Sequence, residues 1–176
     1  SEQRLLEIAA LEPSMRNHHL VVVALASLST LHRERGENET GLAYARDALR
    51  LSEEWGGDLP LASLGALWEL ATYELDAGDL DSVLARHLKT LAIVEHHYGK
   101  QSPRAGQEME SIVSALRLLG RGDEATEYLA RVRRIKDSRG QLGAGDSTWM
   151  RASALPANDV DGGPDSRSLW LRLLRR

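Results

Sequence analysis

Apolar residues recur along most of the chain at spacings of three and four, the pattern of helices with one buried face. The pattern is interrupted at Gly36, Gly78 and Gly120, which are 42 residues apart each time. Because glycine readily adopts the left-handed conformation that ends a helix, each is predicted to form the turn of a helical hairpin. Apolar side chains stand eleven and eight residues before each glycine: Leu25 and Leu28, Leu67 and Leu70, Met109 and Ile112.

Two further interruptions separate the hairpins, at the stretches GGDLP (56–60) and YGKQSP (98–103). In both, a glycine stands where one helix would end and a proline where the next would begin. A lone hairpin cannot bury its apolar face, so hairpins with a fixed period are expected to stack into an all-α solenoid. The predicted helices cover residues 19–35, 38–55, 61–77, 80–97, 104–119 and 122–137.

The same pattern divides the chain into parts. The rhythm stops near residue 137, and the stretch that follows is rich in Gly, Ser, Pro and Asp, which is typical of a flexible linker. The predicted parts are the last helix of a partial preceding repeat at 1–18, three repeats at 19–60, 61–103 and 104–137, a flexible linker at 138–166 and an amphipathic segment at 167–176.

The repeated unit resembles the tetratricopeptide repeat, in the 42-residue form found in kinesin light chains and many bacterial signalling proteins. The resemblance rests on the turn glycine, the small residue five positions after it, and the stretches ALRLSEEWGGDLP (48–60) and TLAIVEHHYGKQSP (90–103). It implies a right-handed superhelix of antiparallel helix hairpins that carries no catalytic chemistry of its own and binds other polypeptides.

The chain departs from the family pattern at several positions. His32 and Glu74 stand where the family usually has Tyr, and Gly41 and Arg133 replace the expected Ala and Leu. The third repeat departs most, as terminal repeats tend to do.

The resemblance also implies a binding groove, because the first helix of each tetratricopeptide hairpin lines a concave face that holds extended peptides. The Lys and Asn residues with which some relatives clamp a terminal carboxylate are missing from the matching positions, which disfavours a C-terminal carboxylate as ligand. The matching residues are Val23, Ala26, Thr30, Arg33 and Glu34; Gly65, Trp68, Thr72, Leu75 and Asp76; and Gln107, Glu110, Ser114, Arg117 and Leu118.

Trp68 lies in the middle of this predicted groove. A large aromatic side chain there could anchor a partner, as tryptophans often do at interfaces. The alternative is that Trp68 packs inside the superhelix against its neighbours. The sequence leaves both interpretations open.

Composition and charge limit the other function classes. The chain of 176 residues has no cysteine, which excludes disulfides and thiolate zinc sites. Its net charge of −4 gives no overall field that would attract nucleic acid. The apolar run 20–28 is too short to span a bilayer, and no signal peptide is recognisable, so we expect a cytoplasmic protein.

Motifs for catalysis and cofactor binding are scarce. The pairs His18–His19 and His96–His97 do not suit one metal ion, because adjacent helical residues point about 100° apart. The glycine-rich stretch 140–145 follows a helix and lacks the lysine of a phosphate-binding loop. We find no nucleophile with a paired base, and therefore expect no enzyme, no metal and no cofactor.

The last residues change character again, in the stretch SLWLRLLRR (168–176). If this stretch is helical it has an apolar and a basic face, and so short a helix needs a surface to be stable. It could cap the last repeat, dock into the groove as an autoinhibitory ligand, or bind a partner; contact with an anionic membrane is not favoured. The apolar face would consist of Leu169, Trp170, Leu173 and Leu174.

The sequence therefore favours a scaffold or adaptor that binds a segment of a partner protein in the groove. The alternative is a peptide-sensing regulatory module of a larger bacterial signalling protein. A protein or peptide is the expected partner, nucleic acid is not expected, and the oligomeric state stays open.

Overall fold

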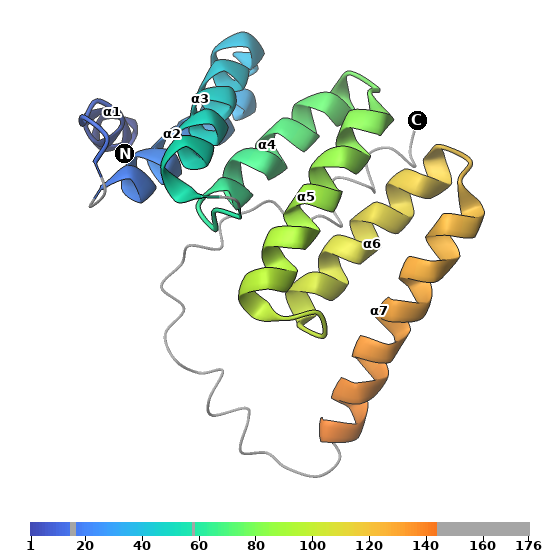
Figure 1. Ribbon diagram of the computed structural model, residues 1–176. Coiled ribbons are helices and arrows are strands. Elements are labelled where there is room, and N and C mark those ends of the chain that lie inside the picture. Colours follow the sequence, from blue (N-terminus) through green and yellow to red (C-terminus); the bar gives the residue numbers. More distant parts are fainter. Residues whose placement is uncertain (15–16, 58, 144–176) are drawn as a thin grey trace.

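The computed structural model describes residues 1–14, 17–57 and 59–143, and all of the regular structure in these ranges is α-helical (Figure 1). The all-α class predicted from the sequence is thus confirmed. The helices are α1 (Glu2–Ala9), α2 (His18–Glu34), α3 (Asn38–Gly56), α4 (Ser63–Asp76), α5 (Leu80–Tyr98), α6 (Pro103–Leu118) and α7 (Gly122–Gly143).

Helices α2 to α6 begin and end within two residues of their predicted bounds. The last helix, α7, continues to Gly143, into the stretch predicted as a linker. The first eighteen residues are not one helix, because α1 ends at Ala9 and α2 begins at His18. The rest of the predicted linker, 144–166, and the segment 167–176 lie outside the described residues.

Five glycines with positive φ, between 74° and 89°, set the lengths of the helices. They recur every 21 residues, at Gly36, Gly57, Gly78, Gly99 and Gly120. Each of the five connections between consecutive helices from α2 to α7 therefore contains one of them. The three turns within hairpins share a Schellman hydrogen bond, which closes the end of a helix through a left-handed residue. The bonds run from the N–H groups of Glu37, Asp79 and Arg121 to the carbonyls of His32, Glu74 and Leu116.

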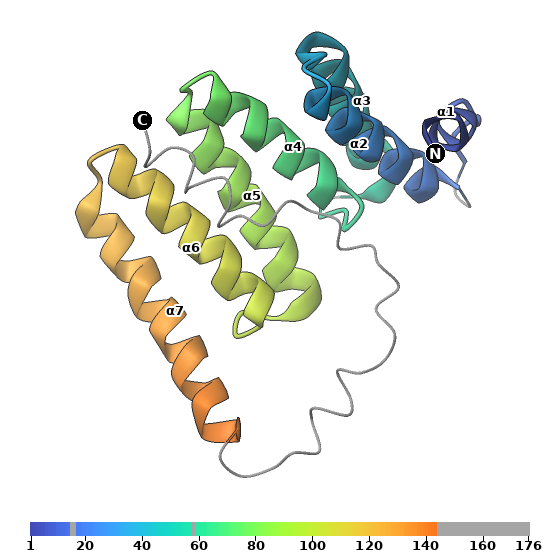
Figure 2. The same cartoon turned by 180° about the vertical axis from the view of Figure 1, so that it is seen from behind.

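Consecutive helices lie side by side in both views of the molecule, with α1 and α7 at opposite ends of the row (Figures 1 and 2). Each helix packs against the next along the chain, and α2 also packs against α4. The apolar residues eleven and eight positions before the turn glycines form the centre of the core, with Leu28, Leu67 and Met109 fully buried.

The two junctions between hairpins solve the same packing problem with different residues. At the first junction the Tyr73 hydroxyl fills the space above Gly41, where a Cβ would lie 2.1 Å from the Tyr73 oxygen. The hydroxyl donates a hydrogen bond of 3.3 Å to the Ser29 carbonyl. At the second junction the equivalent residues are Val83 and Ala115, both buried. The space left by the missing side chain at Gly41 is therefore filled by Tyr73.

An ion pair is repeated at both junctions. Glu53 of α3 pairs with Lys89 of α5, and Glu95 of α5 pairs with Arg131 of α7. The two pairs stand 42 residues apart in the sequence, so the second helices of successive hairpins meet in the same register. Because these side chains are partly exposed, each pair defines the register more than it adds stability.

We expect Gly41→Ala to destabilise the protein by about 2 kcal/mol or more, because the new Cβ would overlap the Tyr73 hydroxyl and crowd the Ser29 carbonyl. Urea unfolding followed by circular dichroism measures this loss. Gly122→Ala is the matched control, since the space around Gly122 is open. Adding Tyr73→Ala should reduce the cost of Gly41→Ala; equal costs in both backgrounds would refute the packing argument.

Candidate functional site

The residues predicted to line a groove all lie on α2, α4 and α6, but they differ in exposure. Among them Val23, Glu34, Asp76, Gln107, Arg117 and Leu118 are exposed. Thr30, Arg33, Gly65, Trp68, Glu110 and Ser114 are half-buried, whereas Ala26, Thr72 and Leu75 are buried.

A hydroxyl group occupies the same place on all three helices, six residues before the turn glycine. Thr30, Thr72 and Ser114 each lie within hydrogen-bond distance of the carbonyl four residues earlier in their own helix. Thr30 makes its shorter bond, 2.8 Å, to Glu69. These hydroxyl hydrogens are thus committed within the protein, and each group would meet a partner as an acceptor only.

Glu69 connects the first two hairpins. Its carboxylate is 3% exposed and accepts hydrogen bonds from the Thr30 hydroxyl and, at 3.1 Å, from Arg33 Nε. A buried carboxylate is tolerated when its oxygens are paired in this way. Two of the predicted groove residues, Thr30 and Arg33, therefore stabilise the packing of α2 on α4.

Glu108 plays the corresponding part between the second and third hairpins. Trp68 Nε1 donates a bond of 2.8 Å to Glu108 Oε1, and His87 Nδ1 lies 3.0 Å from Glu108 Oε2. Both Glu108 and His87 are buried, whereas Trp68 is half-buried. The indole is therefore fixed by its polar edge, and part of its ring stays accessible to solvent.

Sequence reasoning missed Glu69, Glu108 and His87 as members of this network. The internal repeat held a usable signal for one of them, because Glu108 stands where the other hairpins have Ala24 and Ala66. A charged residue at a place otherwise reserved for alanine indicates a buried polar contact with a neighbouring helix.

We expect Glu108→Ala to lower the free energy of unfolding by about 3 kcal/mol, because it removes the buried carboxylate that accepts the Trp68 N–H and contacts His87. Glu108→Gln, which keeps one acceptor, should cost less. Chemical denaturation measures both. The matched control is Glu110→Ala on the same helix, since the Glu110–Lys136 pair is partly exposed and should contribute less than about 1 kcal/mol. Equal costs for the two alanine variants would contradict this account.

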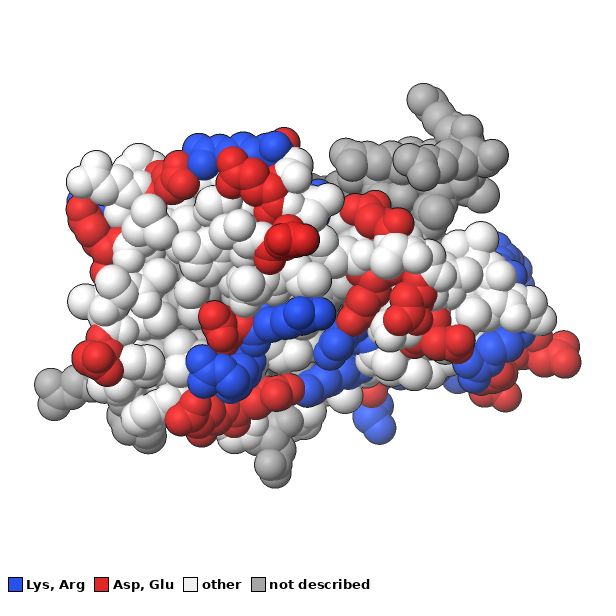
Figure 3. Space-filling view, turned by 90° about the horizontal axis from the view of Figure 1, so that it is seen from above, with Lys and Arg blue, Asp and Glu red and all other residues white. Residues whose placement is uncertain are grey.

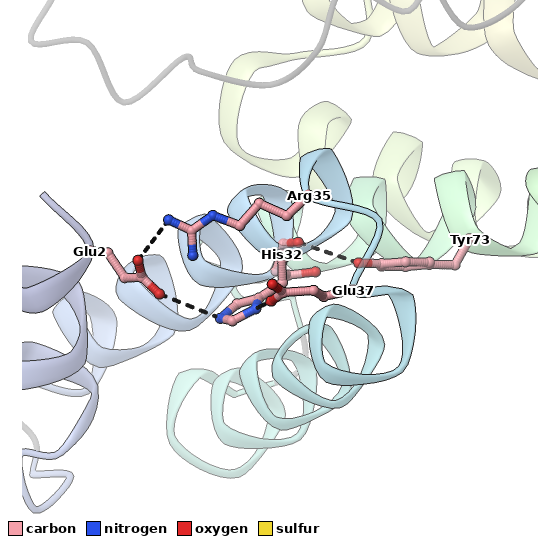
Figure 4. Close-up of polar contacts among 6 residues, drawn as sticks. Glu2, His32, Arg35, Glu37 and Tyr73 are labelled. Carbon is pink, nitrogen blue, oxygen red and sulfur yellow. Dashed lines mark hydrogen bonds and ion pairs between the residues drawn. The ribbon is translucent and has the colours of Figure 1, made fainter.

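Helix α1 has no fully buried residue, and charged side chains join the half-buried Leu5 and Ile8 in holding it to the first hairpin. Glu2 accepts a hydrogen bond of 2.7 Å from Arg35 and lies 4.0 Å from His32 Nε2 (Figure 4). His32 also contacts Glu37. The hydrogen bond from Arg35 holds the pKa of Glu2 below its ordinary value of 4.5.

The attachment of α1 should depend on acid. A carboxyl whose pKa is lowered on docking favours the docked state above its ordinary pKa and loses that contribution as the pH falls through the lowered value. We expect the α1 amide resonances to move towards unfolded positions as the pH falls below the ordinary carboxyl pKa of 4.5. In Glu2→Gln this transition should be absent, while the control Glu7→Gln keeps it. An unchanged transition in Glu2→Gln would show that other groups control α1.

A surface pocket of about 360 Å³ lies on another part of the molecule, between α3, α4 and the start of α5. Leu42, Leu49, Leu70 and Tyr73 supply apolar lining, and Arg46 and Arg86 supply charge. None of the predicted groove residues lines this pocket. Acidic and basic side chains are interspersed over the neighbouring face that contains the hairpin turns (Figure 3).

No group of three or more His, Asp or Glu side chains in the described ranges is arranged to hold a metal ion. No helix in the same part of the chain combines the length and the apolar character needed to cross a membrane.

Comparisons with protein-family models, with curated proteins and with solved structures gave no match. Function is therefore argued from the surfaces of the chain itself.

Proposed function

We propose that the protein is a non-catalytic scaffold of the tetratricopeptide type, which binds a segment of a partner protein on the surface formed by α2, α4 and α6. The observation that carries this proposal is an apolar strip, defined here as Leu20, Val23 and Trp68. Leu20 is 50% exposed and Val23 40% exposed on α2, and the half-buried Trp68 lies on α4.

The register of the two helices supports a continuous surface. Val23 and Gly65 stand thirteen residues before their turn glycines, and Ala26 and Trp68 stand ten before. A Cβ at Gly65 would lie 3.4 Å from the Ala26 Cβ, so α2 and α4 approach closely at this point. The two helices that present the strip therefore lie close together at this point.

The same helices present charged side chains towards their C-terminal ends, where Glu34, Asp76 and Arg117 are exposed. A surface with an apolar half and a charged half suits an amphipathic polypeptide segment, because burial of its apolar side chains drives binding and the charges orient it. The paired groups beneath, Glu69 and Glu108, fix the helices that form this surface.

The proposal also covers how the helical hairpins are arranged in space. Turns that recur every 21 residues and a junction ion pair that recurs after 42 favour a regular solenoid. We propose that it is a right-handed superhelix with α2, α4 and α6 on the concave side. The interpretations of Leu169, Trp170, Leu173 and Leu174 as cap, autoinhibitory ligand or partner-binding element stay predictions, since these residues lie outside the described part.

The test compares two exposed apolar residues from different surfaces. Val23, in the strip, is 40% exposed, and Leu88, on α5, is 39% exposed. The intact chain, Val23→Asp and Leu88→Asp are used as baits in an extract of the producing cells, and retained proteins are identified by mass spectrometry. We expect Val23→Asp to lose at least one partner that Leu88→Asp retains.

Circular dichroism and thermal unfolding of both variants establish that they are folded. Trp68→Phe is a third bait, because it keeps an aromatic side chain while it shortens the ring system and removes the hydrogen bond to Glu108. Partners that survive Val23→Asp and are lost with Leu88→Asp would place the binding surface on the second helices of the hairpins and refute the proposal.

A further inference from the structure

The pocket between α3, α4 and α5 is not a general consequence of stacking hairpins. The place 42 residues further on, at the second junction between hairpins, has different residues at the corresponding positions. Leu116 stands there in place of Glu74, and Tyr128 in place of Arg86. Leu116 is 2% exposed, and Tyr128 packs against the core, so this second place is filled by apolar side chains.

The charged residues at the outer rim of the pocket are also replaced by apolar residues at the second junction. Arg46 and Arg50 of α3 correspond to Leu88 and Ala92 of α5. The first junction therefore combines an open volume of about 360 Å³ with the guanidinium groups of Arg46 and Arg50. At the second junction a leucine and an alanine stand in the places of these two arginines. A volume of this size is in the range of ligand-binding pockets.

The acidic groups of the pocket are already engaged. Glu74 accepts a two-pronged hydrogen bond from Arg86, at 3.0 Å from Nε and 2.9 Å from a terminal nitrogen. Glu53 pairs with Lys89, and Asp79 accepts the Ser82 N–H at the start of α5. Glu74 and Glu53 are thus paired with cationic side chains, and Asp79 is held by a backbone N–H group.

Arg46 is the exception among the charged groups. It makes no hydrogen bond or ion pair with any residue of the described ranges, and it stands one helical turn from the apolar Leu42 and Leu49. Arg50 reaches only its helix neighbours Asp47 and Glu54, at 3.4 and 3.5 Å, and is well exposed. A ligand would meet the unpaired guanidinium group of Arg46 beside an apolar floor, with Arg50 one helical turn further along α3.

We propose that this pocket binds a segment of a partner protein in which an Asp or Glu side chain stands beside a leucine-like side chain. The carboxylate would pair with Arg46, with Arg50 next to it, and the apolar side chain would occupy the space over Leu49 and Tyr73. Guanidinium groups suit carboxylates because their donors match both oxygens. The site is separate from the apolar strip and does not depend on it.

The amphipathic stretch 167–176 is unsuited to this role, because it contains four arginines and no acidic residue.

The experiment selects short random peptides, displayed on phage, against the intact chain. Enriched peptides are synthesised with a fluorescent label and their affinities measured by fluorescence polarisation. The test variant is Arg46→Leu/Arg50→Ala, which installs the residues of the second junction. The matched control is Arg133→Leu/Arg134→Ala on α7, which removes the same charge from exposed positions. Val23→Asp is the control for the apolar strip.

We expect the enriched peptides to share an acidic residue next to a leucine, isoleucine, methionine or phenylalanine. Arg46→Leu/Arg50→Ala should weaken their binding by about tenfold or more, the scale of a lost charge-assisted hydrogen bond. The α7 control and Val23→Asp should bind as the intact chain does, and replacing the acid of the peptide by its amide should weaken binding to the same extent.

Three results would overturn the proposal: no enrichment over a bare support, enriched peptides without an acidic residue, or binding that Arg46→Leu/Arg50→Ala leaves unchanged. Peptides lost only with Val23→Asp would also overturn it, while supporting the apolar strip as a binding surface. Failure at this pocket is thereby distinguished from failure of the proposed scaffold function.

Discussion

The left-handed glycines control the rest of the structure. A residue with a side chain is strained at a φ near 75°, so the chain reverses where Gly36, Gly57, Gly78, Gly99 and Gly120 stand. Turns at equal intervals give hairpins of equal size, and equal hairpins can stack in one register. The repeated ion pairs between α3, α5 and α7 and the matching core positions are consequences of that spacing. Each hairpin then has a neighbour against which its apolar face is buried.

The sequence predicts local structure well because its signals are local. The glycines, the proline at Pro103 and the spacing of apolar residues place α2 to α6 within two residues. The end of α7 was predicted too early, because Ser138 and Gly140 suggested a linker, whereas the helix continues through them to Gly143. Glycine is a weak helix former, yet a cost of about 1 kcal/mol does not by itself end a helix.

The polar contacts between helices were beyond sequence reasoning, since they depend on which side chains meet across a junction. Arg33 was predicted correctly to lie on the first helix of its hairpin, but its pairing with Glu69 required the packing of α2 on α4. Tyr73 and Gly41 are more than thirty residues apart, and a Cβ at residue 41 would overlap the Tyr73 hydroxyl as well as crowd the Ser29 carbonyl. Departures from a family pattern can thus be one half of a compensated pair whose other half lies in the next repeat.

The two candidate surfaces differ because the protein uses its polar groups differently on each. On α2 and α4 the polar side chains near the strip are largely paired off, Arg33 with Glu69 and Trp68 with Glu108, so what remains accessible there is mainly apolar. On α3 the pairing is incomplete, and Arg46 is left facing solvent beside leucines. Binding driven by apolar burial depends little on salt, whereas binding to an exposed guanidinium weakens as ions screen it. Corresponding positions in successive hairpins can carry different side chains while the fold stays the same. One fold can therefore present two candidate surfaces for polypeptides whose affinities would respond differently to ionic strength.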